Sequence, residues 1–278
     1  MIVPRDAATI MLVREAAGGM EVLMLRRNLA SGWVGGMHLF PGGAVDDSDA
    51  APELFARSHA LDDEGASRLL GVAAGGLAFF IAAIRECFEE AGLLLACSRD
   101  GTPVDVASAE GTAERYREHR RRLNGGEATF SALCEAEDLF LDTGRLHYFS
   151  HWITPEGQPR RYDTRFFVAE APPGQSALHD DIEVIDSLWI SPVEALRRHA
   201  SHEIEMMLPT MKNLEAISRF GSAAELLAAT GAATVPTVTP RVRVDHGAMR
   251  ILLPGDEGYD EAEPTVMRST GGPGGGRA

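Results

Sequence analysis

The alternation of apolar and polar positions predicts that strands open the chain. Residues 7–15 and 21–26 are short runs of β-branched and apolar side chains separated by two glycines, the pattern of a β-hairpin. The glycine-rich stretch that follows predicts a loop, a brief strand at 37–40 and a turn at 41–43. A sheet therefore begins the fold.

Further along, helical and extended patterns are interleaved. Helices are expected over 62–70, 78–95, 112–123, 129–138, 208–219 and 222–229. A further helix is expected to begin with Ser191 as its cap and Pro192 as its first residue. Strands are expected over 147–153, 162–170 and 183–190. This irregular order predicts an α/β (α+β) sandwich rather than a regular doubly wound sheet.

The domain division follows from composition. Residues 1–230 have the apolar content of one domain, although the stretch 44–77 within them is polar and alanine-rich. The rest, 231–278, is expected to be an extension that is largely disordered after about residue 258, because its end has too little apolar content to pack.

Charge and cysteine content exclude several classes of protein. A net charge of −15 over 278 residues opposes general nucleic-acid binding. No segment has the length of a membrane span and no leader with a cleavage site is evident, so we expect a soluble, cytoplasmic protein. The three cysteines are spaced like neither zinc ligands nor a disulfide framework, and we expect them to be buried apolar side chains.

The stretch IRECFEEAGLL carries three glutamates on one side of a helix. Glu86, Glu89 and Glu90 fall within an arc of about 100°, and Arg85 precedes Glu89 by four positions, so the two can pair. Like charges at this spacing repel, and a solvated helix face with one ordinary ion pair is the simpler interpretation. A hard divalent cation, which requires oxygen ligands, would offset the repulsion.

The segment Arg85–Leu93 resembles the second half of the Nudix hydrolase signature G-x5-E-x7-R-E-U-x-E-E-x-G-U, where U is a bulky aliphatic residue, apart from a cysteine at the first U. The glutamate that the family has eight residues before the arginine is Leu77 here. Gly42 and Gly43 are the better counterparts of the signature glycine, which implies a motif split by some thirty inserted residues and a missing acidic contact.

The sequence VLMLRRNLASGWVGGMHLFPGG is similar to the upstream motif of coenzyme A (CoA) diphosphatases within that family, although Gly32 replaces its second arginine. A longer Nudix branch that includes peroxisomal CoA-ester hydrolases also resembles the chain in its split motif. The resemblance implies a Nudix α/β/α sandwich with a mixed sheet. It also implies Mg²⁺- or Mn²⁺-dependent hydrolysis of CoA or acyl-CoA to 3′,5′-ADP and (acyl-)phosphopantetheine.

The resemblance and the charge pattern together nominate site residues. Glu86 and Glu90 are the first-choice metal ligands, Glu89 is a further ligand or a base for water, and Arg85 orients Glu89. The candidates for substrate binding are Arg27, Gly42, Gly43, Arg161 and Arg165, although an edge-strand charge pattern explains the last two equally well. Asp181 and Glu183 are candidates for a loop carboxylate, with a plain acidic turn as the alternative.

Two other functions stay open at this stage. The same chemistry would serve an ADP-ribose or dinucleotide pyrophosphatase, because specificity resides in loops. A Nudix-fold sensor that binds such a molecule without cleaving it is favoured by Leu77 and the split motif, and opposed by the three glutamates. Acyl preference cannot be read from the residues, and a homodimer is left open.

Overall fold

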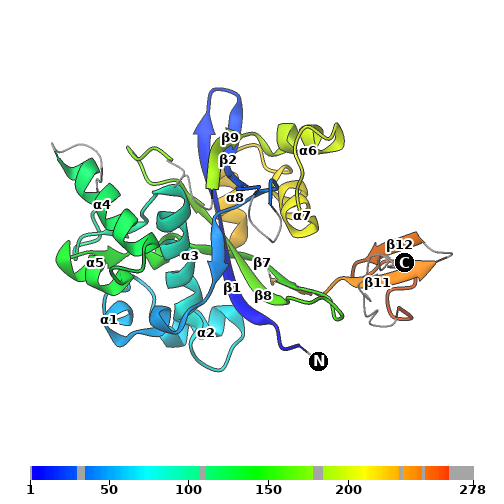
Figure 1. Ribbon diagram of the computed structural model, residues 1–278, viewed down its shortest axis with the longest axis horizontal. Helices are drawn as coiled ribbons and strands as arrows, with labels where there is room; N and C mark the ends of the chain where they lie inside the picture. The colour runs from blue at the N-terminus through cyan, green and yellow to red at the C-terminus, as the bar shows by residue number, and fades with distance from the viewer. Residues whose placement is uncertain are drawn as a thin grey trace, which may run out of the picture.

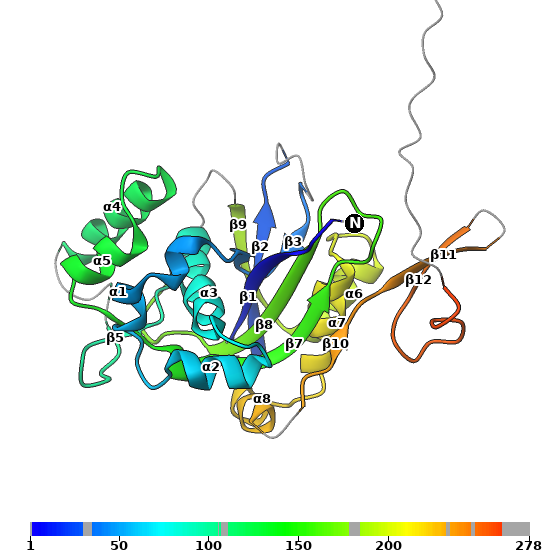
Figure 2. The same cartoon turned by 90° about the horizontal axis from the view of Figure 1, so that it is seen from below.

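The chain forms a mixed β-sheet with helices on both faces (Figure 1, Figure 2). A computed structural model describes residues 2–29, 35–104, 106, 111–177, 184–231, 234–245 and 248–262. Asp181 and Glu183 lie outside the described residues, as does everything beyond residue 262. Among the described helices, none has both the length and the apolar character to cross a bilayer.

The strands belong to one large sheet and two small ones. They are β1 (Arg5–Ala16), β2 (Gly19–Arg27), β3 (His38–Leu39), β4 (Gly42–Ala44), β5 (Ala96–Cys97), β6 (Phe140–Leu141), β7 (His147–Ile153), β8 (Tyr162–Glu170), β9 (Val184–Ile190), β10 (Thr237–Val238), β11 (Arg241–Asp245) and β12 (Ala248–Leu252). Within the described residues, the large sheet has the order β10-β7-β8-β1-β2-β3, and β4 also pairs with β1 and β9 with β2.

The sheet is built around β1. This strand runs parallel to β8 and antiparallel to β2, as the predicted hairpin requires. Its first half also pairs antiparallel with β4, where Ala8 lies opposite Gly43. The same Ala8 lies opposite Arg165 of β8, so one row of paired residues crosses from β4 through β1 to β8.

The helices carry the two outer layers. They are α1 (Pro52–Phe55), α2 (Asp63–Leu70), α3 (Gly76–Ala91), α4 (Thr112–Asn124), α5 (Phe130–Ala136), α6 (Pro192–Ala200), α7 (Leu208–Ile217) and α8 (Ala223–Thr230), with short 3-10 helices η1 (Asp47–Ala50) and η2 (Thr143–Arg145). Ser191 caps α6 by accepting a hydrogen bond from the Glu194 amide, as expected.

Each face of the sheet buries its own core because side chains alternate along a strand. Ile10 and Leu12 of β1 pack with α3 and the helices around it, whereas Met11 and Val13 pack with α6, α7 and α8. Figure 1 shows α1 to α5 on one side of the sheet and α6 to α8 on the other. The expected α/β/α sandwich is confirmed.

Three local expectations need correction. The acidic helix was expected over 78–95 but ends at Ala91, because Gly92 adopts a left-handed conformation (φ 68°) that closes the helix. Two of the three residues of the turn expected at 41–43 belong to strand β4, which runs from Gly42 to Ala44. The stretch 44–77 holds η1 and α1 in addition to the predicted helix at 62–70.

The C-terminal extension also folds in part. Strands β11 and β12 form a hairpin set apart from the main sheet in Figure 1. Tyr259, which was expected to lie in a disordered tail, donates its hydroxyl to the carbonyl of Thr239 (2.7 Å), and its own carbonyl accepts from Arg241 (2.7 Å). The chain therefore remains ordered at least to this tyrosine.

Candidate active site

The glutamates of α3 face the protein, not the solvent. Helix α3 packs against β1, β4 and η1. Glu90 is 4% exposed, and the side chains of Glu86 and Glu89 are 14% and 23% exposed. A solvated acidic face would leave all three in water, so that simpler interpretation is wrong for this helix.

Arg85 is the centre of a buried charge cluster. Its Nε and Nη2 donate to the two oxygens of Asp49 at 2.7 and 2.9 Å, and Nη2 also donates to the carbonyl of Ala44 at 3.0 Å. Its Nη1 donates to Glu86 Oε1 at 2.8 Å and to Glu89 Oε2 at 3.3 Å, which confirms the expected Arg85–Glu89 pair. The arginine therefore orients two of the three glutamates.

Asp49 is a site residue that the sequence motifs did not reveal. It is fully buried (0% exposed) and lies six residues after Gly43, the spacing between glycine and acid in the first half of the Nudix signature. Counting forward from Gly43 would have found it, whereas counting back from Arg85 led to Leu77. Leu77 is instead a buried core residue of α3, so the acidic contact that seemed to be lost is supplied by Asp49.

The charges in the cluster perturb one another. Burial raises the pKa of Glu86 to about 7; the charge of Arg85 opposes that rise and the charge of Glu89 adds to it. Burial likewise raises the pKa of Glu89, against the attraction of Arg85. Burial works against the charge of Arg85, but the hydrogen bond to Asp49 and the charge of Glu86 raise its pKa. The carboxylates thus retain unfavourable charge that a cation would relieve.

The FPGG segment lies directly against the glutamates. The amide of Gly42 donates to Glu90 Oε2 at 2.9 Å. A Cβ placed on Gly43 would lie 2.5 Å from Glu86 Oε1, so only glycine lets this carboxylate approach the strand. Among the described residues, the oxygens of Glu86, Glu89 and Glu90 do not all gather within 4.8 Å, because Glu90 turns to Gly42 and the other two turn to Arg85.

Helix α4 contributes a cation at the end of α3. Arg120 is 8% exposed, and its Nε donates to the backbone carbonyl of Glu89 at 2.8 Å. Asn124 donates to the same carbonyl at 3.2 Å. Arg120 is therefore not a solvated surface charge of α4, because its side chain holds the carbonyl end of α3.

The two arginines predicted for substrate binding near β8, Arg161 just before the strand and Arg165 within it, have different surroundings. Arg161 donates to the carbonyls of Thr154 and Ile2 at 3.0 and 2.8 Å, so it holds the N-terminal segment. Arg165 is 6% exposed, pairs with Asp163 and lies 5.2 Å from the ring centre of Phe79 on α3. The structure therefore places the Arg165 side chain against α3, whereas the Arg161 side chain is bound to backbone carbonyls.

His151 completes the cluster around Arg165. Its Nε2 lies 2.5 Å from both Asp163 and Arg165, and its Nδ1 lies 2.8 Å from the Thr237 hydroxyl. Burial and the charge of Arg165 lower the pKa of His151 to about 4. On β2, Arg27 is half-buried at the last position and lies opposite Val184 of β9.

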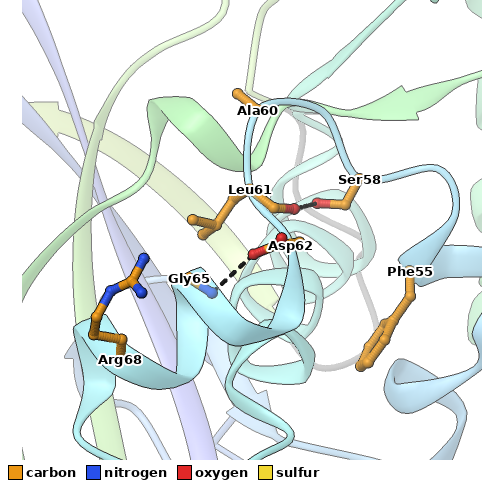
Figure 3. A pocket seen from close by; sticks show the side chains of 7 residues that line it. All are labelled: Phe55, Ser58, Ala60, Leu61, Asp62, Gly65 and Arg68. Atoms are coloured by element: carbon orange, nitrogen blue, oxygen red, sulfur yellow. Dashed lines mark hydrogen bonds between the residues drawn. The ribbon is translucent and has the colours of Figure 1, made fainter.

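Two cavities lie away from these residues. One, of about 470 Å³, lies between α1 and α2 (Figure 3), lined by Phe55, Ser58, Ala60, Leu61, Asp62, Gly65 and Arg68. The other, of about 240 Å³, borders the tip of the β1–β2 hairpin and the start of α6. Neither lining includes a predicted site residue, so the carboxylate cluster is identified by its chemistry and not by a cavity.

Comparisons with known proteins agree with this geometry. The family model described as the NUDT19 Nudix domain matches residues 66–217, more than half of the chain. The acyl-coenzyme A diphosphatase NUDT19 of Gallus gallus is 33% identical, over 92% of this chain and 80% of the relative. The human protein of the same name is 30% identical, over 88% of this chain and 74% of the relative.

A solved structure shares the fold. The crystal structure of a NUDIX hydrolase from Alicyclobacillus acidocaldarius superimposes with a TM-score of 0.67 and is 31% identical. The match covers 82% of this chain and 97% of the other. The similarity therefore extends through most of the sandwich as well as the acidic helix.

Proposed function

The chain belongs to the NUDT19 Nudix domain family, and from that premise we propose that it hydrolyses the diphosphate of CoA or acyl-CoA with the aid of Mg²⁺ or Mn²⁺. The products are 3′,5′-ADP and (acyl-)phosphopantetheine. The observation that carries the proposal is the buried cluster of Arg85, Asp49 and the three glutamates against the FPGG segment. We take residues 1–230 as the catalytic domain.

The residues of the cluster fit a hard divalent cation. Its donor set is made of carboxylate oxygens, and the glycine at 43 lets the carboxylate of Glu86 lie directly against strand β4. Glu86 and Glu90 would hold the ion, and Glu89 is a further candidate ligand. When bound, the ion neutralises charge on the diphosphate and lowers the pKa of the attacking water.

The chain's own side chains divide the remaining work. Glu89 is the most exposed of the three glutamates and has a raised pKa, which suits a group that takes a proton from water. Arg85 holds this carboxylate in one rotamer through the bond at 3.3 Å. Asp49 fixes Arg85 in turn, so the base is positioned by two residues behind it.

Substrate phosphates need local cations, since the chain carries a net charge of −15. Arg27 at the end of β2 and Arg165 on the covered face of the sheet are the arginines we assign to this task. Arg161 is a weaker candidate because backbone carbonyls already occupy its guanidinium. The backbone of Gly42 and Gly43 would line the approach to the diphosphate.

Two alternative functions would involve the same carboxylates and can be distinguished by one experiment. ADP-ribose or a dinucleotide would meet the same carboxylates, and a non-catalytic sensor would bind without turnover. The sensor hypothesis drew support from the acid that seemed to be missing at Leu77, and Asp49 removes that support. The odd number of cysteines, all buried, fits a reducing compartment, and we propose a cytoplasmic location.

The decisive experiment is a product-resolved hydrolysis panel. Purified protein receives CoA, an acyl-CoA, ADP-ribose or a diadenosine polyphosphate, each with Mg²⁺, with Mn²⁺ or with excess chelator. We expect 3′,5′-ADP from the CoA substrates and no turnover in chelator. Preferential cleavage of ADP-ribose would reassign the substrate, and full activity in chelator would end the metal-dependent mechanism.

A matched pair of variants separates site from surface. Glu90→Gln keeps the shape of the side chain but removes its negative charge and one of its two oxygen ligands, so kcat on CoA should fall by about 100-fold or more. Glu64→Gln makes the same change at a side chain that is 88% exposed on α2 and should leave kcat unchanged. Equal activity of both variants would show that α3 does not carry the chemistry.

A further inference from the structure

A second group of ligand-type side chains lies outside the acidic helix. One ligand atom each from His59, Cys97 and Asp142 lies within 4.8 Å of the other two. His59 follows α1, Cys97 ends β5 and Asp142 follows β6. In the described part of the chain this is the one trio of histidine, cysteine or acidic residues that meets this spacing.

Hydrogen bonds to backbone carbonyls fix the three residues relative to one another. The amide of His59 donates to the carbonyl of Leu141 at 2.8 Å, and the Thr143 hydroxyl donates to the carbonyl of His59 at 2.7 Å. The amide of Asp142 donates to the carbonyl of Leu95 at 3.1 Å, and β5 pairs with β6 beside Cys97. The cluster is thus held by the fold itself, as a preorganised site requires.

The side chains of His59, Cys97 and Asp142 form few hydrogen bonds or ion pairs with other residues that the structure describes. No hydrogen bond joins the His59 ring or the Cys97 thiol to another residue that the structure describes. Asp142 occupies the cap position of η2 but makes no capping bond, and it forms an ion pair with Arg145 at 3.3 Å. A carboxylate has two oxygens, so this ion pair leaves one of them available.

The surroundings exclude bulk water from one side. Cys97 is fully buried, and Gly101 packs so closely that a Cβ there would lie 3.1 Å from His59 Cε1 and Nε2. Burial, with the charge of Asp142, raises the pKa of the Cys97 thiol to about 11. A metal ion that binds the sulfur of Cys97 would displace the thiol proton.

We propose that His59, Cys97 and Asp142 bind a Zn²⁺ ion. Nitrogen, sulfur and oxygen donors together suit zinc, whereas Mg²⁺ and Ca²⁺ require oxygen. A thiolate and a carboxylate balance the two positive charges of the ion, and three protein ligands leave a fourth position for water. Cysteine spacing gave no sign of this site because its ligands are of three types from three distant segments.

An ion bound by these three residues would act on the stability of the fold. It would link the segment between α1 and α2 to β5 and β6, which are close in space and distant in sequence. Helix α2 in turn supports the start of α3, where Asp63 accepts hydrogen bonds from the amides of Gly75 and Leu77 at 3.0 Å. Zinc should therefore raise the melting temperature of the protein by binding the folded state.

Cobalt spectroscopy tests the site on the full-length chain. The protein is stripped of metal, saturated with Mg²⁺ to occupy the carboxylates of α3, and titrated with Co²⁺. We expect sulfur-to-cobalt charge-transfer absorption that saturates at one equivalent, disappears when Zn²⁺ is added, and is accompanied by a higher melting temperature with zinc. Carboxylates alone cannot produce this absorption because they carry no sulfur.

Variants locate the signal. Cys97→Ser should abolish the absorption, whereas Cys134→Ser, at another buried cysteine, should retain it. His59→Gln and Asp142→Asn should weaken zinc binding at least about 10-fold, the lower bound set by outer-shell substitutions. A folded wild-type protein without the absorption would overturn the proposal, as would absorption that persists in Cys97→Ser. If that variant fails to fold, the wild-type titration and His59→Gln decide the matter.

Discussion

Replacing Gly43 by alanine should separate catalysis from stability. The new Cβ would lie 2.5 Å from Glu86 Oε1 and 2.7 Å from Oε2, whereas ordinary contact begins at 3.4 Å. The carboxylate must therefore retreat by about 1 Å, and misplacement of that size can reduce a rate about 100-fold. Gly43 does not have a positive φ, so the backbone of β4 accommodates alanine without strain.

The cost in stability should be small for the same variant. The atoms that must move are the far end of one side chain, and the loss is chiefly the 2.8 Å hydrogen bond from Arg85 Nη1. Arg85 keeps both bonds to Asp49, and Glu86 is already destabilised by burial. We therefore expect a change in unfolding free energy within about 1 kcal/mol, the size of one hydrogen bond.

The assay compares two alanine variants. CoA hydrolysis with saturating Mg²⁺ and thermal melting without metal are measured on Gly43→Ala and on Gly18→Ala. A Cβ on Gly18, in the β1–β2 turn, would meet no atom of the described residues within 4 Å, and the residue has no positive φ, so its variant should match the wild type in both assays. Unchanged turnover in Gly43→Ala would refute the claim that Glu86 must stand against the strand for catalysis.

Other predictions concern the charges around Arg85. Asp49→Asn leaves the guanidinium with a weakened buried partner and should cost about 2–4 kcal/mol of unfolding free energy, whereas Asp47→Asn, exposed on the same turn, should change it by less than about 0.5 kcal/mol in urea melts. Between about pH 4.5 and 7 the folded protein keeps a proton on Glu86 that the unfolded chain has released, so the unfolding free energy of the metal-free protein should fall as pH rises through this window. In Glu86→Gln this fall in unfolding free energy should be smaller by roughly 1–3 kcal/mol. A pH profile identical to that of the wild type would show that folding does not raise the pKa of Glu86.

Local patterns were enough to place most elements of the sandwich. Strands β7 and β8 fall at the predicted 147–153 and 162–170, and Ser191 caps its helix as foreseen. These features depend on the alternation of neighbouring residues or on a side chain three positions from the amide it binds. Such information is complete within a short window of sequence.

The acidic helix shows what a short window of sequence does not determine. Its amphipathic pattern indicated a charged face, but the pattern is the same whether that face meets water or a strand. Packing against β4 decided it: Gly42 donates to Glu90, and the absence of a side chain at Gly43 admits Glu86. The sequence thus determined which residues share a face, and the tertiary structure determined what the face contacts.

Contacts between distant segments depended on the tertiary structure alone. Asp49 reaches Arg85 across thirty-six positions because α3 packs on the turn that follows β4. His59, Cys97 and Asp142 meet because three separate segments exchange backbone hydrogen bonds. A sequence states which donors and acceptors exist, but it does not state which of them pair. The energy of an ion pair or a metal site depends on the distances between its atoms, and only the folded chain sets those distances.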